Sequence, residues 1–86
     1  MTTITVNGID FNVEIDTGFG EIEVTDINGN KVAFAEIDQN MKQGSYTVFD
    51  EDGEGEELPL PREIYNDLAD GDGAEAAYWL CAISFD

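Results

Sequence analysis

The chain has 86 residues with 20 Asp and Glu, three Lys and Arg and no His, which gives a formal net charge of −17. This length suits one domain, and because 42% of the residues are apolar, enough for a core, the charge does not by itself predict disorder. The same charge argues against direct nucleic-acid binding, because affinity for phosphates needs Lys and Arg to displace counterions.

The first half of the chain alternates apolar and polar residues, which is the period of a strand with one buried face. Residues 3–15 show this pattern on both sides of Asn7-Gly8, and this dipeptide is the strongest short signal for a hairpin turn. Residues 21–37 repeat the plan around a second Asn-Gly. The expected strands are residues 3–6, 9–15, 21–26, 31–37 and 45–50. They predict an antiparallel meander, in which the strand at 31–37 is apolar on both faces and suits a central position covered on both sides.

The second half opens with DEDGEGEE at residues 50–57, where six of eight residues are carboxylates. We expect a loop here, because so dense a block of like charge repels itself and stays in water. Pro61 suits the first position of a helix, and Ile64 and Leu68 supply an apolar stripe, so residues 61–70 are expected to be helical.

Residues 74–85 combine an alanine-rich start that favours helix with an aromatic, apolar remainder that favours a buried strand. Periodicity does not separate the two, because the run is apolar on all sides. We expect a strand from about Ala77 and keep helix as the alternative. The architecture predicted for residues 1–86 is a single compact α+β domain, with an antiparallel sheet of five to six strands packed by one or two short helices.

Carboxylates are expected on the outer face of this sheet, opposite the apolar positions of the strands. The candidates are Asp10, Glu14, Asp16, Glu21, Glu23 and Asp26. Residues on one face of a strand lie ~6.5–7 Å apart and neighbouring strands ~4.8 Å apart, while phosphates follow each DNA strand every ~3.4 Å. The spacings are of the same order, so these carboxylates are suited to present a phosphate-like field to a groove lined with Arg and Lys. An ordinary polar sheet face is the alternative, which the absence of Lys and Arg from residues 9–15 and 21–26 disfavours.

A second group of carboxylates comes from the acidic loop and from the glycine-rich turn after the predicted helix. It comprises Asp50, Glu51, Asp52, Glu54, Glu56, Glu57, Asp70 and Asp72. We expect these side chains to extend the negative surface around one end of the sheet and to share in binding a partner. The alternative is a flexible, solvated loop that is acidic for solubility.

The sequence predicts no catalytic group, cofactor or dedicated metal site. Placing Gly53 or Gly73 at position six of a calcium-binding EF-hand loop puts Val48 or Leu68 at position one, where an acidic ligand is needed. Only weak, nonspecific binding of divalent cations is therefore expected. The absence of His excludes Ser-His and Cys-His dyads. Cys81, the one cysteine, excludes an intrachain disulfide, and its apolar surroundings predict a core residue rather than a nucleophile.

The aromatic residues divide into expected core residues and expected contact residues. Those expected in the core are Phe11, Phe34, Tyr46, Tyr78 and Trp79. Phe19 and Tyr65 are the candidates for exposed contacts, Phe19 because it lies in a glycine-flanked turn, where an aromatic side chain can anchor an interface. For Phe19, folding back onto the sheet is an equally good alternative.

The start of the chain, MTTITVNGID, has neither a basic region nor an apolar run, so no signal peptide is expected. The longest apolar run, near residues 76–85, is too short to cross a bilayer. We therefore expect a cytoplasmic protein without membrane association, either a monomer or a dimer.

In size, charge and β-rich plan, the chain resembles the small acidic DNA-mimic inhibitors of phages and mobile elements, which include anti-restriction proteins, uracil-DNA glycosylase inhibitor and several anti-CRISPR proteins. The resemblance covers the whole chain and rests on composition and architecture, without a matching motif. It implies a non-enzymatic inhibitor, in the host cytoplasm, that occupies the DNA- or RNA-binding site of a CRISPR effector complex, a restriction enzyme or another DNA-processing protein. Two alternatives are an acidic assembly or chaperone module for a basic protein, and a small halophilic domain whose acids serve solubility in high salt.

Overall fold

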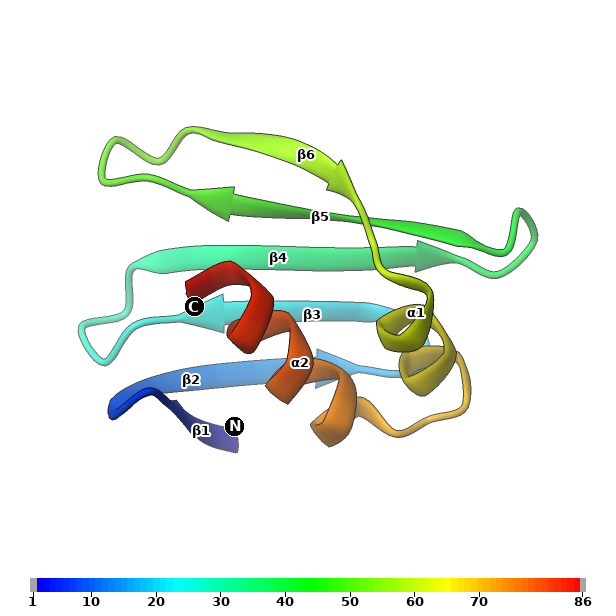
Figure 1. Ribbon diagram of the computed structural model, residues 1–86, viewed down its shortest axis with the longest axis horizontal. Helices are drawn as coiled ribbons and strands as arrows, with labels where there is room; N and C mark the ends of the chain where they lie inside the picture. The colour runs from blue at the N-terminus through cyan, green and yellow to red at the C-terminus, as the bar shows by residue number, and fades with distance from the viewer. Residues whose placement is uncertain (1, 86) are drawn as a thin grey trace.

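The structure, a computed structural model, describes residues 2–85 and consists of one six-stranded antiparallel sheet with two helices on one face (Figure 1). The strands are β1 (Thr2–Val6), β2 (Ile9–Asp16), β3 (Glu21–Thr25), β4 (Lys31–Asp38), β5 (Gln43–Phe49) and β6 (Gly55–Pro59), and they lie side by side in chain order. Helices α1 (Arg62–Ala69) and α2 (Gly73–Phe85) follow. The predicted α+β class and the antiparallel sheet are therefore confirmed.

The turns that join the strands differ from one another. In the β1–β2 turn, Asn7 and Gly8 both have positive φ, 53° and 80°, which is the conformation of a type I′ turn. The β3–β4 connection is longer. There the backbone N–H of Asp26 donates to the carbonyl of Asn30 at 2.9 Å, and Gly29 alone has positive φ, at 88°. The second Asn-Gly therefore lies inside a five-residue loop rather than forming a two-residue turn.

The acidic segment at 50–57 is only partly a loop, because β6 begins at Gly55 and pairs with β5. The expectation of a loop throughout was wrong for a physical reason. An edge strand leaves one side of its backbone in water, so it tolerates charged side chains and a proline such as Pro59. Glu57 pairs with Thr47 in this register, so the charge of the segment is carried on a strand.

Residues 74–85 are helical, and the expectation of a C-terminal strand was wrong. The buried residues of α2 recur at helical spacing, at Gly73, Ala76, Ala77, Leu80 and Cys81. Most of them are small, which lets the helix approach the sheet closely. A Cβ atom on Gly73 would lie 2.3 Å from Cγ2 of Ile15. Exposed Tyr78, Trp79 and Ile83 on the other side of the helix conceal this period in the sequence.

The core lies between the two helices and the sheet face that they cover. Ala33 and Ala35 of β4 are buried there, whereas Phe34, between them, points to the other face and is half-buried. The strand is therefore not covered on both sides, as its composition suggested. Phe11 of β2 is buried as predicted, and its ring stacks on that of Phe85 with centroids 4.6 Å apart.

Candidate functional site

The face of the sheet opposite the helices has no element over it among residues 2–85, and it carries carboxylates on neighbouring strands (Figure 1). The residues that define this open face are Asp10, Glu14, Asp16, Glu21, Glu23, Phe34, Glu36 and Glu57. Asp16 of β2 pairs with Glu21 of β3, and Glu21 in turn pairs with Glu36 of β4. Directly opposite residues lie ~4.5–5.5 Å apart, so this register places three carboxylates in one row across three strands.

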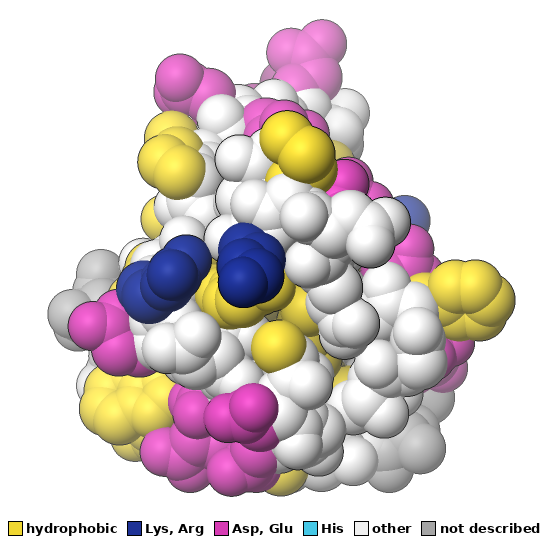
Figure 2. Space-filling view, turned by 90° about the vertical axis from the view of Figure 1, so that its right-hand side faces the viewer, with side chains coloured by type: hydrophobic (Ala, Val, Ile, Leu, Met, Phe, Trp, Pro, Cys, Tyr) yellow, Lys and Arg dark blue, Asp and Glu magenta, His cyan; other side chains and the backbone are white. Residues whose placement is uncertain are grey.

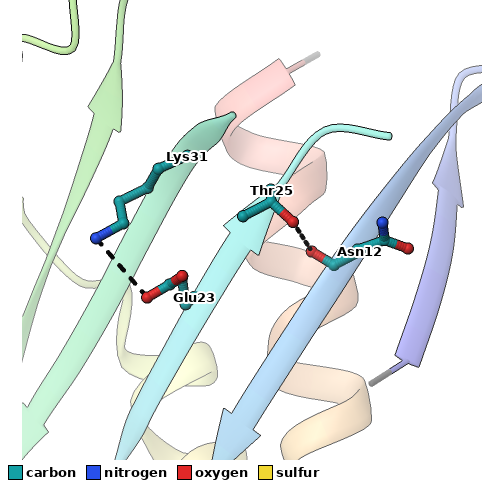
Figure 3. Close-up of polar contacts among 4 residues, drawn as sticks. All are labelled: Asn12, Glu23, Thr25 and Lys31. Carbon is teal, nitrogen blue, oxygen red and sulfur yellow. Dashed lines mark hydrogen bonds and ion pairs between the residues drawn. The ribbon is translucent and has the colours of Figure 1, made fainter. Parts of the chain in front are cut away.

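A second row of the open face repeats the like-charge pairing. Glu14 pairs with Glu23, which pairs with Phe34 on the next strand. Like charges directly opposite across a sheet are destabilising. Only Lys31 compensates them among the described residues, with its Nζ 3.7 Å from Oε2 of Glu23 (Figure 3). Both side chains are largely in water, where an ion pair contributes little.

Glu36 was missed by the sequence interpretation, because both faces of β4 are apolar and the outward one was not identifiable. The same ambiguity concealed Phe34, which was expected in the core and lies half-buried on the open face between Glu23 and Thr47. The backbone that carries these side chains is held by the pairing of β2 with β3. The Thr25 hydroxyl adds a bond between the two strands, since it donates to the Asn12 carbonyl at 3.4 Å (Figure 3). The open face thus places an aromatic side chain beside carboxylates, with Glu23 across on β3 and Glu36 on the same strand.

Asp26, predicted to belong to this face, lies instead in the β3–β4 turn and holds it together. Its carboxylate accepts the backbone N–H groups of Asn28 and Asn30, both at 2.9 Å. These bonds favour the charged form, so the pKa of Asp26 lies below its usual value, with the backbone bond from Asn30 as the largest cause.

Asp50 makes the same turn in the acidic segment. Its carboxylate accepts the N–H groups of Asp52 and Glu54, its backbone N–H donates to the carbonyl of Glu54, and Gly53 takes positive φ. The first residues of the segment are therefore an ordered turn, in which Asp50 has a structural role and Glu51 is exposed.

The second predicted group does not gather at one end of the sheet. The turn that contains Asp50 lies beside the turn that contains Asp26, whereas Asp70 and Asp72 lie at the opposite end, between α1 and α2 (Figure 1). Asp72 accepts the backbone N–H of Glu75 at 3.3 Å and so caps α2. The prediction of one continuous acidic end was wrong, because the chain crosses the length of the sheet along β6 before it reaches the helices.

Two of the three cations lie away from the open face. Lys42 follows β4, Arg62 begins α1, and Nη1 of Arg62 donates to the carbonyl of Lys42 at 3.2 Å. Figure 2 shows Lys and Arg side chains gathered at the middle of this end of the molecule, with acidic side chains below them. Their position leaves the carboxylates of the open face without further compensation.

Exposed aromatic residues are distributed differently from the sequence prediction. Phe19 is 78% exposed, in agreement with a contact role, but Tyr65 is only 8% exposed and belongs to the core. Tyr78 and Trp79, expected in the core, are 44% and 46% exposed on α2. The indole N–H of Trp79 donates to Oε1 of Glu75 at 2.9 Å. The helical spacing of the small residues in α2 was the signal that could have identified them.

Comparison with known proteins gives no family: no protein-family model, curated protein or solved structure matches the chain. Within residues 2–85, no cluster of three or more His, Cys, Asp or Glu side chains is placed to hold a metal ion. None of the helices in that range has the length and apolarity needed to cross a membrane. Burial raises the pKa of the Cys81 thiol to about 11, so this side chain is a poor nucleophile.

Proposed function

We propose that the open face binds a basic nucleic-acid-binding protein at its nucleic-acid site, with carboxylates in place of phosphates, and thereby inhibits it without catalysis. The observation that carries this proposal is the uncompensated row of Asp16, Glu21 and Glu36 across three strands. Such a row weakens the free sheet, and the repulsion is offset when the row meets positive charge, as in a groove lined with Arg and Lys. The protein proposed as target is a CRISPR effector complex, a restriction enzyme or a similar DNA-processing protein.

Binding by this face would combine steering and anchoring. The field of the chain accelerates encounter with a cationic groove, and added salt slows that encounter. Charge alone discriminates poorly among basic partners, so specificity requires an apolar contact. Phe34, on the open face beside Glu23 and Glu36, supplies it, because a partly exposed aromatic side chain is a frequent interface anchor.

Carboxylates also lie at both ends of the sheet and on the helices, so negative charge by itself does not single out the open face. The regular spacing of the carboxylates across neighbouring strands distinguishes the open face, because the paired strands hold several negative charges at fixed positions. Five of the acids outside this array have a local role as turn or helix acceptors. They are Asp26, Asp38, Asp50, Asp72 and Glu75. Within the array Asp16 shares such a role, because its carboxylate accepts the backbone N–H of Phe19 at 3.1 Å.

The test compares two double charge reversals. Glu21→Lys with Glu23→Lys alters the open face, and Glu63→Lys with Asp70→Lys alters the helix side. Each single reversal adds two charges, so both double variants change the net charge from −17 to −13. The immobilised proteins are incubated with bacterial lysate at low salt, and bound proteins are eluted with duplex DNA or with salt.

The expected result is that the natural chain captures a nucleic-acid-binding protein that duplex DNA displaces, and that only the open-face variant captures about tenfold less, equivalent to about 1.4 kcal/mol. Purified restriction enzymes and CRISPR effector complexes then serve as direct probes of inhibition. A partner that DNA does not displace would instead indicate an assembly module. Equal losses for both variants would show that placement of the charge is irrelevant and would refute the proposal.

A further inference from the structure

The two edges of the sheet differ in a way that points to self-association. The β6 edge carries Glu56, Glu57 and Pro59, which are the residues that proteins use to prevent strand addition. The β1 edge, TTITV, has no charge, proline or bulge over its five residues, and no strand lies outside it among residues 2–85. In a chain of net charge −17, an uncharged and unprotected edge is the exception that needs an explanation.

The turn geometry fixes which backbone groups of β1 point outward. A two-residue turn closes on a hydrogen-bonded pair, here Val6 with Ile9, and bonded and non-bonded pairs alternate from there. Ile4 therefore bonds to β2, while the N–H and C=O groups of Thr3 and Thr5 face away from the sheet. These four groups are a preformed but empty half of an antiparallel ladder.

We propose that a second copy of this chain occupies the β1 edge, in antiparallel register about a two-fold axis at Ile4. This register places Thr3 of one copy opposite Thr5 of the other, so the outward groups of both strands complete four hydrogen bonds with one another. In this register like side chains lie opposite each other: Ile4 faces Ile4 on the helix side of the sheet, and Thr3 faces Thr5 on the open face. A shift by one residue would place isoleucine opposite threonine and would lose the hydrogen bonds as well.

The charge around the edge is compatible with this pairing once salt is present. The acid nearest to β1 on the open face is Asp10, which accepts a 2.5 Å hydrogen bond from the Thr5 hydroxyl. Across the proposed junction, the two Asp10 residues are three strand spacings apart and offset by two residues along the strand, which is ~16 Å in all at ~4.8 Å per strand and ~3.3 Å per residue. The screening length is about 8 Å at physiological ionic strength. Self-association is therefore expected to strengthen as salt rises, which is the opposite of binding to a basic partner.

The helix side of the junction is apolar as well. Tyr78 lies seven residues before Phe85, on the same flank of α2, and Phe85 stacks on Phe11 of β2. Helix α2 packs against β1 as well as β2, and Tyr78 is 44% exposed on it. Ile9, at the start of β2, is 54% exposed. A second copy would cover part of both side chains and would join the two open faces into one surface, although the pairing does not depend on the function proposed for that face.

The first test is the molar mass in solution, by light scattering after size exclusion, at high protein concentration and increasing salt. The expected result is a mass that rises from 9.4 kDa towards twice that value. Thr3→Pro removes an outward N–H without removing a bond to β2, so this variant is expected to stay at one chain. Glu57→Pro is the matched change on the opposite edge and is expected to form the dimer as the natural chain does. A single-chain mass at every salt concentration would overturn the proposal.

A cysteine at the axis tests the register and remains informative if Thr3→Pro does not fold. Opposite residues of a non-bonded antiparallel pair lie ~4.5 Å apart, within disulfide range. Ile4→Cys is therefore expected to form a covalent dimer with oxidised glutathione. Thr3→Cys is the control, because the two copies of residue 3 are offset by two residues, ~6.6 Å along the strand. At one strand spacing of ~4.8 Å this puts them ~8 Å apart, beyond that range. Buried Cys81 is present in both variants and stays unreactive. Cross-linking of Thr3→Cys as fast as Ile4→Cys, or of neither, would refute this register.

Discussion

Replacement of Glu21 by lysine is expected to make the fold more stable while it weakens binding. Glu21 lies between Asp16 on β2 and Glu36 on β4, so Glu21→Lys converts two like-charge pairs into two opposite-charge pairs. Each favourable cross-strand pair contributes roughly 0.2–1 kcal/mol. The two together are expected to add about 1 kcal/mol to the free energy of unfolding. In a domain of this size, that raises Tm by about 4–8 °C.

Thermal unfolding followed by circular dichroism at low salt measures this change, with two comparison variants. Glu63→Lys on α1 changes the net charge equally but has no opposed carboxylate across a strand. Because Glu63 lies in the first turn of α1, where the helix dipole favours negative charge, this variant is expected to lose about 0.3–1 kcal/mol of stability. Glu21→Gln removes the repulsion without adding an attraction, so its free energy of unfolding is expected to lie between those of the natural chain and Glu21→Lys. The gain from Glu21→Lys is expected to shrink in molar salt, because exposed charges are screened.

A Glu21→Lys variant that is less stable than the natural chain, or no more stable than Glu63→Lys, would refute the inferred repulsion. A more stable variant that still captures the partner would separate the two claims, since the repulsion would be real but not used for binding. A gain in stability with a loss of binding is the pattern of a site maintained for function at the expense of the fold.

Three other predictions test the packing and the turns. Gly73→Ala is expected to lower the free energy of unfolding by about 1–3 kcal/mol, because its Cβ would meet Ile15 Cγ2 at 2.3 Å; an unchanged urea midpoint would contradict the docking of α2. Asp26→Asn is expected to flatten the loss of stability in acid, measured by urea unfolding at several pH values. The bond from Asn30 holds the folded-state pKa of Asp26 below its ordinary value of 3.8, so the stabilisation is present above that value and lost as pH falls through the folded-state pKa. Cys81 is expected to resist alkylation at mildly alkaline pH until urea is added, since burial raises its pKa to about 11; rapid labelling of the folded chain would show that α2 opens.

The parts of the fold that the sequence predicts are those where one face is apolar and the other polar. Strands β1 to β3 alternate cleanly, and α1 has its stripe at Ile64 and Leu68, so period and polarity agree there. In α2, exposed Tyr78 and Trp79 make the run apolar all round, and the period disappears. In β6, charge conceals an edge strand, because its pairing is made by the backbone and leaves no apolar pattern.

The candidate site was predictable in part for the same reason. Alternation placed Glu21 and Glu23 on the outer face, but nothing local in the sequence states that strands follow each other in register, and register is what makes their neighbours acidic. The turn role of Asp26 and Asp50 did have a signal. Both begin an Asp-x-x-Gly segment, DING and DEDG, in which the aspartate accepts backbone N–H groups and the glycine takes positive φ.

One charge distribution should produce three different salt dependences, and these separate the competing explanations of the acidity. Partner binding should weaken with salt, pairing at β1 should strengthen, and the fold should become more stable as repulsion is screened. A halophilic domain shares only the last of these. If salt stabilises the natural chain and the Glu63→Lys variant alike but has less effect on Glu21→Lys, the repulsion is concentrated on the open face. That outcome would favour a face built to meet positive charge, because acidity that served only solubility would gain nothing from an opposed row of carboxylates.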